Sequence, residues 1–494
     1  MSHMPPASPA PVGAASDPPS PGEQRGVIAI VLVGVSLVAV DTTIVVLGLP
    51  VMMQELHASL ARMVWVMMAY LLVLTMLATQ LGRLGDMYGR VRMYNAGFAL
   101  FTLGSVLCGL SLSSAALIAS RVVQGIGGAL VTANSGAIIA DAIPAARRGR
   151  AFGITGMGWS LGAILGILLG GVLITYVNWR AIFFINLPIG VAALAAGRRI
   201  LRDRAARVAR RLDLPGIGLM GAGLFALLWG LTQMTGEGFD ALVAGRLGVA
   251  AVLLGAFAVW ERRAAAPLLD FSLFRHRVLV ASILAATFQA LGGYAVMFLV
   301  IMYLQGVRGL SPFTASMLLV PSYLVGSVIG PWAGRLADRH GARWPATLGL
   351  LVQALGIALY ASLSVDAPLW RVVLAAVVNG IGNSAFFPAN NSAVVVHAPR
   401  DAYGVANGLL RTFSNVGMVS SFAVALLMAS EAIPRWAAFA IFLGVSRLAG
   451  PLRSAYMAGF HAALALSIAL VLVAAGLSYA RDDRRSRASA AAAG

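Results

Sequence analysis

The chain has 494 residues, of which 59% are hydrophobic and only 11% are charged, and its mean hydropathy is +0.85. A soluble protein of this length needs far more charge on its surface, so this composition indicates that most of the chain faces lipid. The formal net charge is +18, and all 36 basic residues are Arg. Nucleic-acid binding is one interpretation of that charge. The arginine that membrane proteins keep on their cytoplasmic side explains it better, so no nucleic-acid partner is expected.

Membrane spans are predicted along nearly the whole chain. Residues 1–25 are rich in Pro, Ala and Ser and are expected to form a disordered tail. They lack the features of a cleaved signal peptide, so the first apolar run is expected to stay as a span. About fourteen apolar runs are close to the roughly 20 residues that cross a bilayer. They lie near 27–51, 64–82, 93–112, 115–139, 151–176, 180–197, 214–234, 244–260, 278–303, 312–333, 345–363, 371–396, 403–430 and 455–480.

The arginines are distributed unevenly among the gaps between these runs. Placing the N-terminus inside puts most of them on the cytoplasmic side, which predicts a multi-pass protein of the cytoplasmic (inner) membrane with both termini in the cytoplasm. The gap 198–211 is especially rich in Arg and is expected to contact lipid phosphates. The apolar piece 436–446 is too short to span, so segment 431–454 is expected to form an external hairpin.

Two motifs occur twice in the chain. The stretch Gly82–Arg90 recurs as Gly334–Ala342, and Gln124–Gly127 recurs as Asn379–Gly382 at nearly the same offset. Two motifs duplicated together indicate two related halves, and membrane carriers built this way hold their substrate between the halves. The predicted division is a tail (1–25), an N-terminal six-helix bundle (26–198), a basic linker with two extra helices (199–276), a C-terminal six-helix bundle (277–480) and a cytoplasmic tail (481–494).

Asp41 is the one acidic residue that falls well inside a predicted span. An ionisable group at that depth is costly and is a functional candidate by default. Arg121, in the fourth predicted span, lies at a similar depth and is its natural partner. A purely structural ion pair is the alternative, but the isolation of Asp41 on an apolar helix favours a proton switch. Arg411 is a second cation inside a span, and it either lines the cavity or extends to the inner interface.

The gap after the second predicted span has the composition of a gate. Its glycines, Gly82 and Gly89, allow a tight turn, and Asp86 can cap the next helix or accept hydrogen bonds from an arginine. A simple positively charged turn is the alternative, but the recurrence of the motif in the second half argues against it. The residues predicted to form a latch between the bundles are Gly82, Asp86, Gly89, Arg90, Asp338 and Arg339.

A cavity between the halves needs polar and aromatic walls. The residues at mid-span positions that are expected to line it are Gln124, Trp159, Phe288, Tyr294, Asn379, Phe386, Phe387 and Arg411. In the fifth predicted span the glycines are spaced by four, which predicts a smooth face for close helix packing. These glycines are Gly158, Gly162, Gly166 and Gly170.

Several stretches carry a family resemblance. They are Asp41–Pro50, Gly82–Arg92, Leu117–Gly125, Trp179–Arg180 with Phe183–Gly190, and Tyr303–Gln305 with Gly309, Ser311 and Pro312. Over about residues 27–480 the chain resembles a major facilitator superfamily carrier, specifically the fourteen-span drug:proton antiporter branch of EmrB/QacA type. The resemblance implies an all-α membrane fold of two pseudo-symmetric six-helix bundles plus two inserted helices. It also implies a part in proton transfer for Arg121.

The predicted function is proton-coupled efflux of amphipathic small molecules or drugs by alternating access, with protons, substrate and membrane lipids as partners. A dedicated exporter or proton-independent facilitator of one metabolite is an alternative. The run Gly166–Gly171, which lacks the proline of the family's antiporter motif, and Val46, where the branch usually has Asn, favour it. A non-transporting receptor or scaffold is a second alternative, although a scaffold has no need of a duplicated gate. No cluster of His, Cys and carboxylates lies within the spans, so neither an enzyme nor a cofactor is expected.

Overall fold

The computed structural model describes residues 20–204, 212–237, 240–264, 267, 276–397, 406, 409–418, 420–421, 424 and 450–481. Over these ranges the protein is helical and contains no strand. Twelve of its helices are long and apolar enough to cross a membrane, and one further helix, bent by 52°, brings the total to 13. The all-α membrane fold is therefore confirmed. The remaining predicted span, 403–430, and the predicted hairpin within 431–454 lie largely outside the described residues.

The helices fall into three groups along the chain. The first is α1 (Pro21–Glu55), α2 (Leu60–Tyr88), α3 (Arg90–Gly109), α4 (Ser114–Ala142), α5 (Ala145–Tyr176), α6 (Ala181–Phe184) and α7 (Asn186–Ile200). The second is the pair α8 (Leu214–Glu237) and α9 (Ala241–Glu261). The third is α10 (Arg277–Met302) with its π-helical continuation η2 (Tyr303–Val307), α11 (Pro312–His340), α12 (Arg343–Ala361), α13 (Leu369–His397) and α16 (Gly450–Tyr479).

The first helix begins inside the segment predicted to be a disordered tail. Ser20 and Glu23 form a capping box, in which each side chain accepts a hydrogen bond from the other residue's backbone N–H at 3.2 and 3.0 Å. Pro21 occupies the first helical position, where its fixed φ suits a helix. The tail boundary predicted after residue 25 therefore lies too far along the chain, because these caps start α1 at Pro21.

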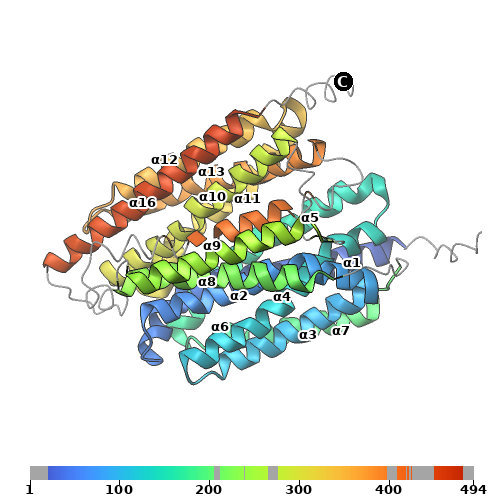
Figure 1. Cartoon of the computed structure of the whole chain (residues 1–494), viewed down its shortest axis with the longest axis horizontal. Helices are drawn as coiled ribbons and strands as arrows, with labels where there is room; N and C mark the ends of the chain where they lie inside the picture. The colour runs from blue at the N-terminus through green and yellow to red at the C-terminus, as the bar shows by residue number, and fades with distance from the viewer. Residues whose placement is uncertain are drawn as a thin grey trace, which may run out of the picture.

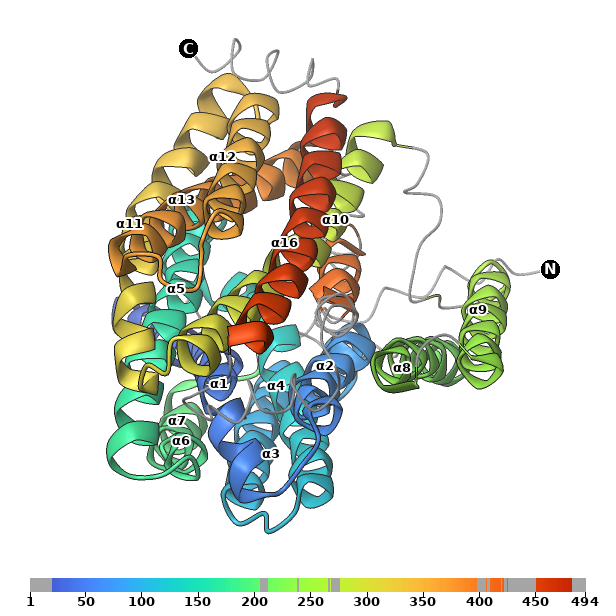
Figure 2. The ribbon, with the colours of Figure 1, turned by 90° about the vertical axis from the view of Figure 1, so that its left-hand side faces the viewer.

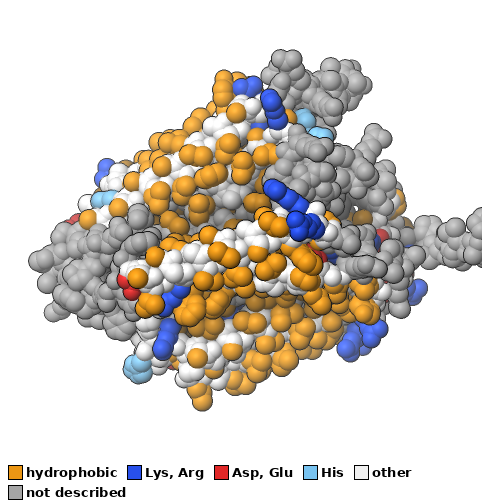
Figure 3. Space-filling model, viewed as in Figure 1, with side chains coloured by type: hydrophobic (Ala, Val, Ile, Leu, Met, Phe, Trp, Pro, Cys, Tyr) orange, Lys and Arg blue, Asp and Glu red, His pale blue; other side chains and the backbone are white. Residues whose placement is uncertain are grey.

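The first and third groups form the two halves of the molecule. Helices α8 and α9 stand outside both, with α8 beside α2 and α9 on the far side of α8 (Figures 1 and 2). Trp65 of α2 holds α8 in place: its indole N–H donates to Thr232 Oγ1 at 3.3 Å, and its ring lies 5.3 Å from that of Phe225. The outer helix α9 is apolar at its surface, where Val252 is 70% exposed. Figure 3 shows apolar side chains spread over this face, with arginines gathered toward the helix ends, as expected of a surface in contact with lipid.

The two copies of each duplicated motif adopt the same local structure. Gly89 and Gly341 end α2 and α11 with φ of +107° and +89°, a backbone conformation that favours glycine. At a second equivalent pair, Gly104 packs on the backbone of Gln124, and Gly356 packs on the backbone of Asn379, with no room for a side chain at either glycine. The halves are therefore related in three dimensions as well as in sequence.

The predicted glycine stripe of α5 packs on α1, which confirms its role in close helix packing. A Cβ added at Gly158 or Gly170 would lie 2.8 Å from the side chain of Leu32 or of Ile44. The adjacent Gly171 faces the other half instead, because a Cβ there would lie 3.0 Å from the Cα of Phe313. Helix α5 thus joins α1 of the first half to α11 of the second.

The hydrogen bonds and ring contacts described between spans of the two halves lie at one end of the molecule, where α1 and α5 finish and α11 begins. Gln305 Nε2 donates to the carbonyl oxygen of Leu47 at 3.4 Å, and Phe313 N donates to Thr175 Oγ1 at 3.2 Å. The rings of Phe313 and Tyr176 lie 6.0 Å apart. We call this the distal end. The opposite end, where α1 begins, carries both copies of the arginine-containing motif and is called the arginine end.

Candidate functional site

The predicted partners Asp41 and Arg121 form an ion pair inside the first half. Asp41 Oδ2 and Arg121 Nη1 are 2.5 Å apart, and the two side chains are 0% and 1% exposed. Both come from long apolar helices, Asp41 from α1 and Arg121 from α4, which deliver the two charges to one depth. Because each charge is fully removed from solvent, each is stabilised there by the other.

Arg121 has further partners that fix its guanidinium group. Its Nε donates to the carbonyl oxygen of Val66 at 3.0 Å, and its Nη1 donates to Gln124 Oε1 at 2.6 Å. Its Cζ lies 4.2 Å from the centre of the Tyr70 ring, a cation–π contact. The arginine therefore ties α4 to α2 whether or not Asp41 carries its charge.

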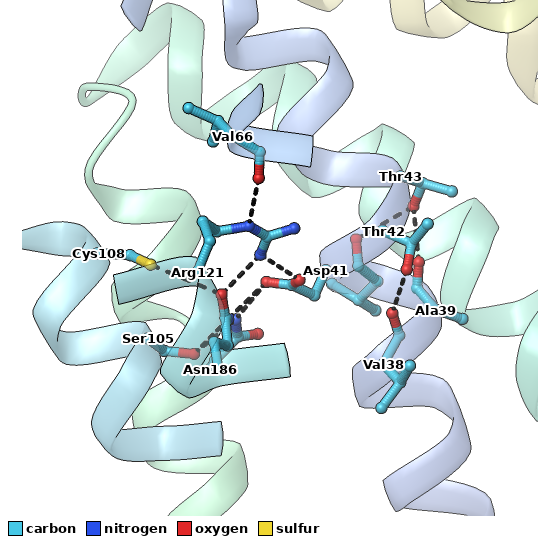
Figure 4. Close-up of polar contacts among 12 residues, drawn as sticks. Val38, Ala39, Asp41, Thr42, Thr43, Val66, Ser105, Cys108, Arg121 and Asn186 are labelled. Carbon is cyan, nitrogen blue, oxygen red and sulfur yellow. Dashed lines mark hydrogen bonds and ion pairs between the residues drawn. The ribbon is translucent and has the colours of Figure 1, made fainter. Parts of the chain in front are cut away.

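Two amide side chains complete the surroundings of the carboxylate (Figure 4). Gln124 Nε2 donates to Asp41 Oδ1 and to Ser105 Oγ, each at 2.7 Å. Asn186 Nδ2 lies 3.4 Å from Asp41 Oδ1 and 3.3 Å from Ser105 Oγ, both as a donor. We call Asp41, Ser105, Arg121, Gln124 and Asn186 the carboxylate network. The network joins α1, α3, α4 and α7 around the carboxylate of Asp41.

The expectation that Gln124 lines the cavity is wrong, because its side chain is fully buried in this network. The reason is helical spacing: Gln124 lies three residues after Arg121 and so faces the same partner. Asn186 belongs to the family motif Phe183–Gly190, but the sequence analysis assigns it no role. The sequence signal for its role is that Asn186 is the single amide residue in the apolar run 181–197.

A change in the protonation of the Asp41 carboxylate would alter the contacts that hold α1 against α4. While Asp41 is charged, it accepts hydrogen bonds from three donors on other helices. Protonation removes the charge that attracts Arg121 and converts an acceptor into a donor. The tie between α1 and α4 therefore depends on the protonation state of one buried group.

The predicted latch residues of the first half lie at the arginine end. Arg90 Nε and Nη2 donate to Asp86 Oδ1 at 2.9 and 2.8 Å, and Arg90 Nη1 donates to Asp141 Oδ1 at 2.6 Å. Asp203 caps α3 by accepting from Val91 N at 2.7 Å. These contacts join α2, α3 and α4 within one half. The contacts described for Asp86 and Arg90 lie within this half, where Asp141, at the end of α4, takes the second face of the guanidinium, and the bridge between the two bundles stays a prediction.

Other predicted site residues are placed as follows. In the second copy of the motif Arg339 is exposed, and the side chain of Asp338 lies outside the described residues. Arg411 is exposed as well. Trp159 on α5 is 40% exposed, and Phe386 is fully buried behind Phe387, with ring centres 5.6 Å apart, so Phe386 is not a cavity wall. The predicted wall residues of the second half that keep some accessible surface are Phe288, Tyr294, Asn379 and Phe387.

Comparison with known proteins gives one family. The family model described as Major Facilitator Superfamily matches residues 31–422 and 283–494. The tetracenomycin C resistance and export protein of Streptomyces glaucescens is 34% identical over 81% of this chain and 75% of its own length. The puromycin resistance protein pur8 of Streptomyces alboniger is 31% identical over 99% of this chain and 97% of its own length. The riboflavin transporter RibZ of Clostridioides difficile is 31% identical over 79% of this chain and 85% of its own length.

Solved structures agree on the fold. An inward-facing bacterial homologue of the human lysosomal transporter Spinster superposes with a TM-score of 0.66, at 19% identity, over 95% of this chain and 98% of that one. A D-xylose–proton symporter also gives a TM-score of 0.66, at 14% identity, over 94% of this chain and 99% of that one. At these identities the likeness concerns the fold alone.

Proposed function

Because the chain belongs to the Major Facilitator Superfamily, with antibiotic and multidrug exporters among its relatives, we propose that it exports amphipathic small molecules in exchange for protons. The observation that carries this proposal is the ion pair of Asp41 with Arg121, buried in the first half and surrounded by amide donors. A buried carboxylate of this kind has no need to exist for packing alone, since an apolar side chain would be less costly.

The arginine end is proposed to face the cytoplasm, since arginine is retained on that side of a membrane. Both termini then lie in the cytoplasm, and the protein resides in the cytoplasmic membrane. The described hydrogen bonds and ring contacts between spans of the two halves lie at the distal end. The conformation is accordingly proposed to be closed toward the outside and open toward the cytoplasm, ready to accept substrate.

Helix α1 is proposed to couple the proton to the movement of the halves. It carries Asp41, and two turns later it carries the carbonyl of Leu47 that accepts a hydrogen bond from Gln305 of the second half. Protonation of Asp41 loosens α1 from Arg121, while Arg121 keeps Val66 and Gln124 as partners. A shift of α1 alters the distal contact and, through the glycine stripe of α5, the packing on α11.

The cluster of Asp86, Arg90 and Asp141 is proposed to act as a gate at the cytoplasmic end. It locks α2, α3 and α4 into one rigid unit. A rigid unit can swing as a whole when the distal contacts open, which is the motion that alternating access requires. Reorganisation of this cluster then accompanies closure toward the cytoplasm.

A dedicated exporter of one metabolite is a second candidate, favoured by the presence of a riboflavin transporter among the relatives. The two candidates differ in the breadth of compounds carried. A protein that moves one compound out of a panel of cationic, neutral and anionic dyes fits the second candidate.

Transport by purified protein in liposomes with an imposed pH gradient tests the proposal. Asp41→Asn should abolish gradient-driven transport, because the substituted side chain cannot take up a proton. Asp366→Asn makes the same chemical change at an exposed carboxylate and should leave transport intact. Full gradient-driven transport by Asp41→Asn would overturn the proposal, and equal transport with and without the gradient by the unaltered protein would favour a facilitator.

A further inference from the structure

The second half contains a group of uncharged amide side chains in its interior. Gln289 of α10 donates from Nε2 to Gln353 Oε1 of α12 at 3.2 Å and to Asn383 Oδ1 of α13 at 2.9 Å. Asn379 lies one turn before Asn383 on α13. Gln289 and Gln353 are each 1% exposed, while Asn379 and Asn383 keep part of their surface accessible. We call these four residues the amide cluster.

One member of the amide cluster, Asn379, occupies the position that Gln124 holds in the carboxylate network of the first half. Gly356 packs on the backbone of Asn379 as Gly104 packs on that of Gln124, so Asn379 and Gln124 are equivalent. Gln353 is instead equivalent to Phe101, because Gly382 packs on Gln353 as Gly127 packs on Phe101. The helices α10, α12 and α13 contain no Asp or Glu anywhere in their sequences. The second half thus has a polar centre next to the equivalent of Gln124, and this centre is built from amides on helices that carry no carboxylate.

Two carbonyl oxygens in the amide cluster lack a partner. Gln289 Oε1 and Asn379 Oδ1 are buried and form no hydrogen bond. In this arrangement the Gln289 amide nitrogen serves two acceptors, so its oxygen is the atom left without a partner. Buried carbonyls without donors are rare in folded proteins because leaving them unpaired is costly. A bound molecule that brings hydroxyl or N–H groups to these oxygens removes that cost.

Partly accessible aromatic residues follow the amides along α13 and α10. Phe387 lies one turn after Asn383 and so shares its helix face. Tyr294 lies five residues after Gln289 and is partly accessible as well. The neighbouring faces of α13 are already used, since Gly380 packs on Ser322 of α11. On the other side of α13, Asn383 reaches α10, where it accepts the hydrogen bond from Gln289.

We propose that the amide cluster is the substrate-recognition site and that it selects uncharged aromatic molecules bearing hydroxyl or N–H donors. This inference rests on the proposed export function and adds the class of substrate. A cationic substrate has no counter-charge here, because these three helices lack carboxylates and Asp41 is buried and occupied by Arg121. The two halves then have different roles: the first half binds and releases the proton, and the second half binds the substrate.

Equilibrium binding to purified protein, without a pH gradient, tests this assignment. The first probe is chloramphenicol, an uncharged aromatic with hydroxyl and amide donors, and the second is tetraphenylphosphonium, an aromatic cation without donors. The unaltered protein should bind chloramphenicol more tightly. Gln289→Leu and Asn379→Leu should each raise its Kd by about threefold to tenfold, the effect of one lost hydrogen bond. Gln233→Leu, the same change on α8, should have no effect.

A variant that gains affinity for a probe separates an effect at the site from a loss of binding through misfolding. Asn379→Asp keeps the shape of the side chain and adds a carboxylate at a partly accessible position, so it should create affinity for tetraphenylphosphonium. Tighter binding of tetraphenylphosphonium than of chloramphenicol by the unaltered protein would overturn the assignment, as would an unchanged chloramphenicol Kd in both leucine variants. Asp41→Asn should still bind chloramphenicol, so failure of the proton-coupling proposal and failure of this one give different results.

Discussion

Removal of Arg121 is expected to be among the most damaging single changes in the first half. The substitution Arg121→Leu leaves the Asp41 carboxylate, which is 0% exposed, with only the amide donors of Gln124 and Asn186. Breaking a buried ion pair by deleting one partner costs about 3–5 kcal/mol, because the other charge is left uncompensated. The loss of the cation–π contact with Tyr70 acts in the same direction. The folded state should therefore lose about 3–5 kcal/mol of stability.

The assay is reversible unfolding in mixed micelles, with Arg92→Leu as a control that removes an exposed arginine and should be close to neutral. The double variant Asp41→Asn with Arg121→Leu contains no buried charge, so it should regain most of the lost stability. A double variant no more stable than Arg121→Leu alone would refute the reasoning. It would mean that Arg121 acts through its shape and that the burial of Asp41 is not what the arginine compensates.

Three further outcomes follow from the geometry. Asp86→Asn should slow transport several-fold, because it weakens the contact of Asp86 with Arg90 at the arginine end. The Kd for substrate should stay unchanged, because the amide cluster is intact; transport kinetics and equilibrium binding, measured in parallel, test both. Gly89→Ala should cost about 1–3 kcal/mol in the same unfolding assay, since φ is +107° there and Asp203 occupies the space of a side chain. Gly162→Ala should cost about 1–3 kcal/mol, because the new methyl group meets the backbone of α1, and unfolding measurements test it.

The partnership of Asp41 with Arg121 could be predicted from the sequence because both residues are charged, rare at that depth and reachable by counting helical rise. The glycine stripe of α5 was predictable for a similar reason, since a spacing of four defines a face. The start of α1 was not predicted, although Ser20, Pro21 and Glu23 form a standard capping pattern in the sequence.

The remaining contacts depend on how helices distant in sequence pack. Asp86 and Arg90 are four residues apart, so their pairing is local, but the approach of Asp141 is set by the crossing of α4. Gln124 was expected in the cavity because it is polar and in mid-span, and only the position of α1 decides that it faces Asp41 instead. Helical periodicity in the sequence indicates which residues share one face of a helix, but it does not indicate which other helix packs against that face.

The most direct test of proton coupling through Asp41 is proton release on substrate binding. Purified protein in weakly buffered detergent solution, with a pH-sensitive dye, receives a saturating amount of a transported compound. The unaltered protein should release protons in proportion to the compound bound, because substrate and proton exclude each other in an antiporter. Asp41→Asn should bind the compound and release none. Equal proton release by Asp41→Asn and by the unaltered protein would contradict the assignment of Asp41 as the protonation site.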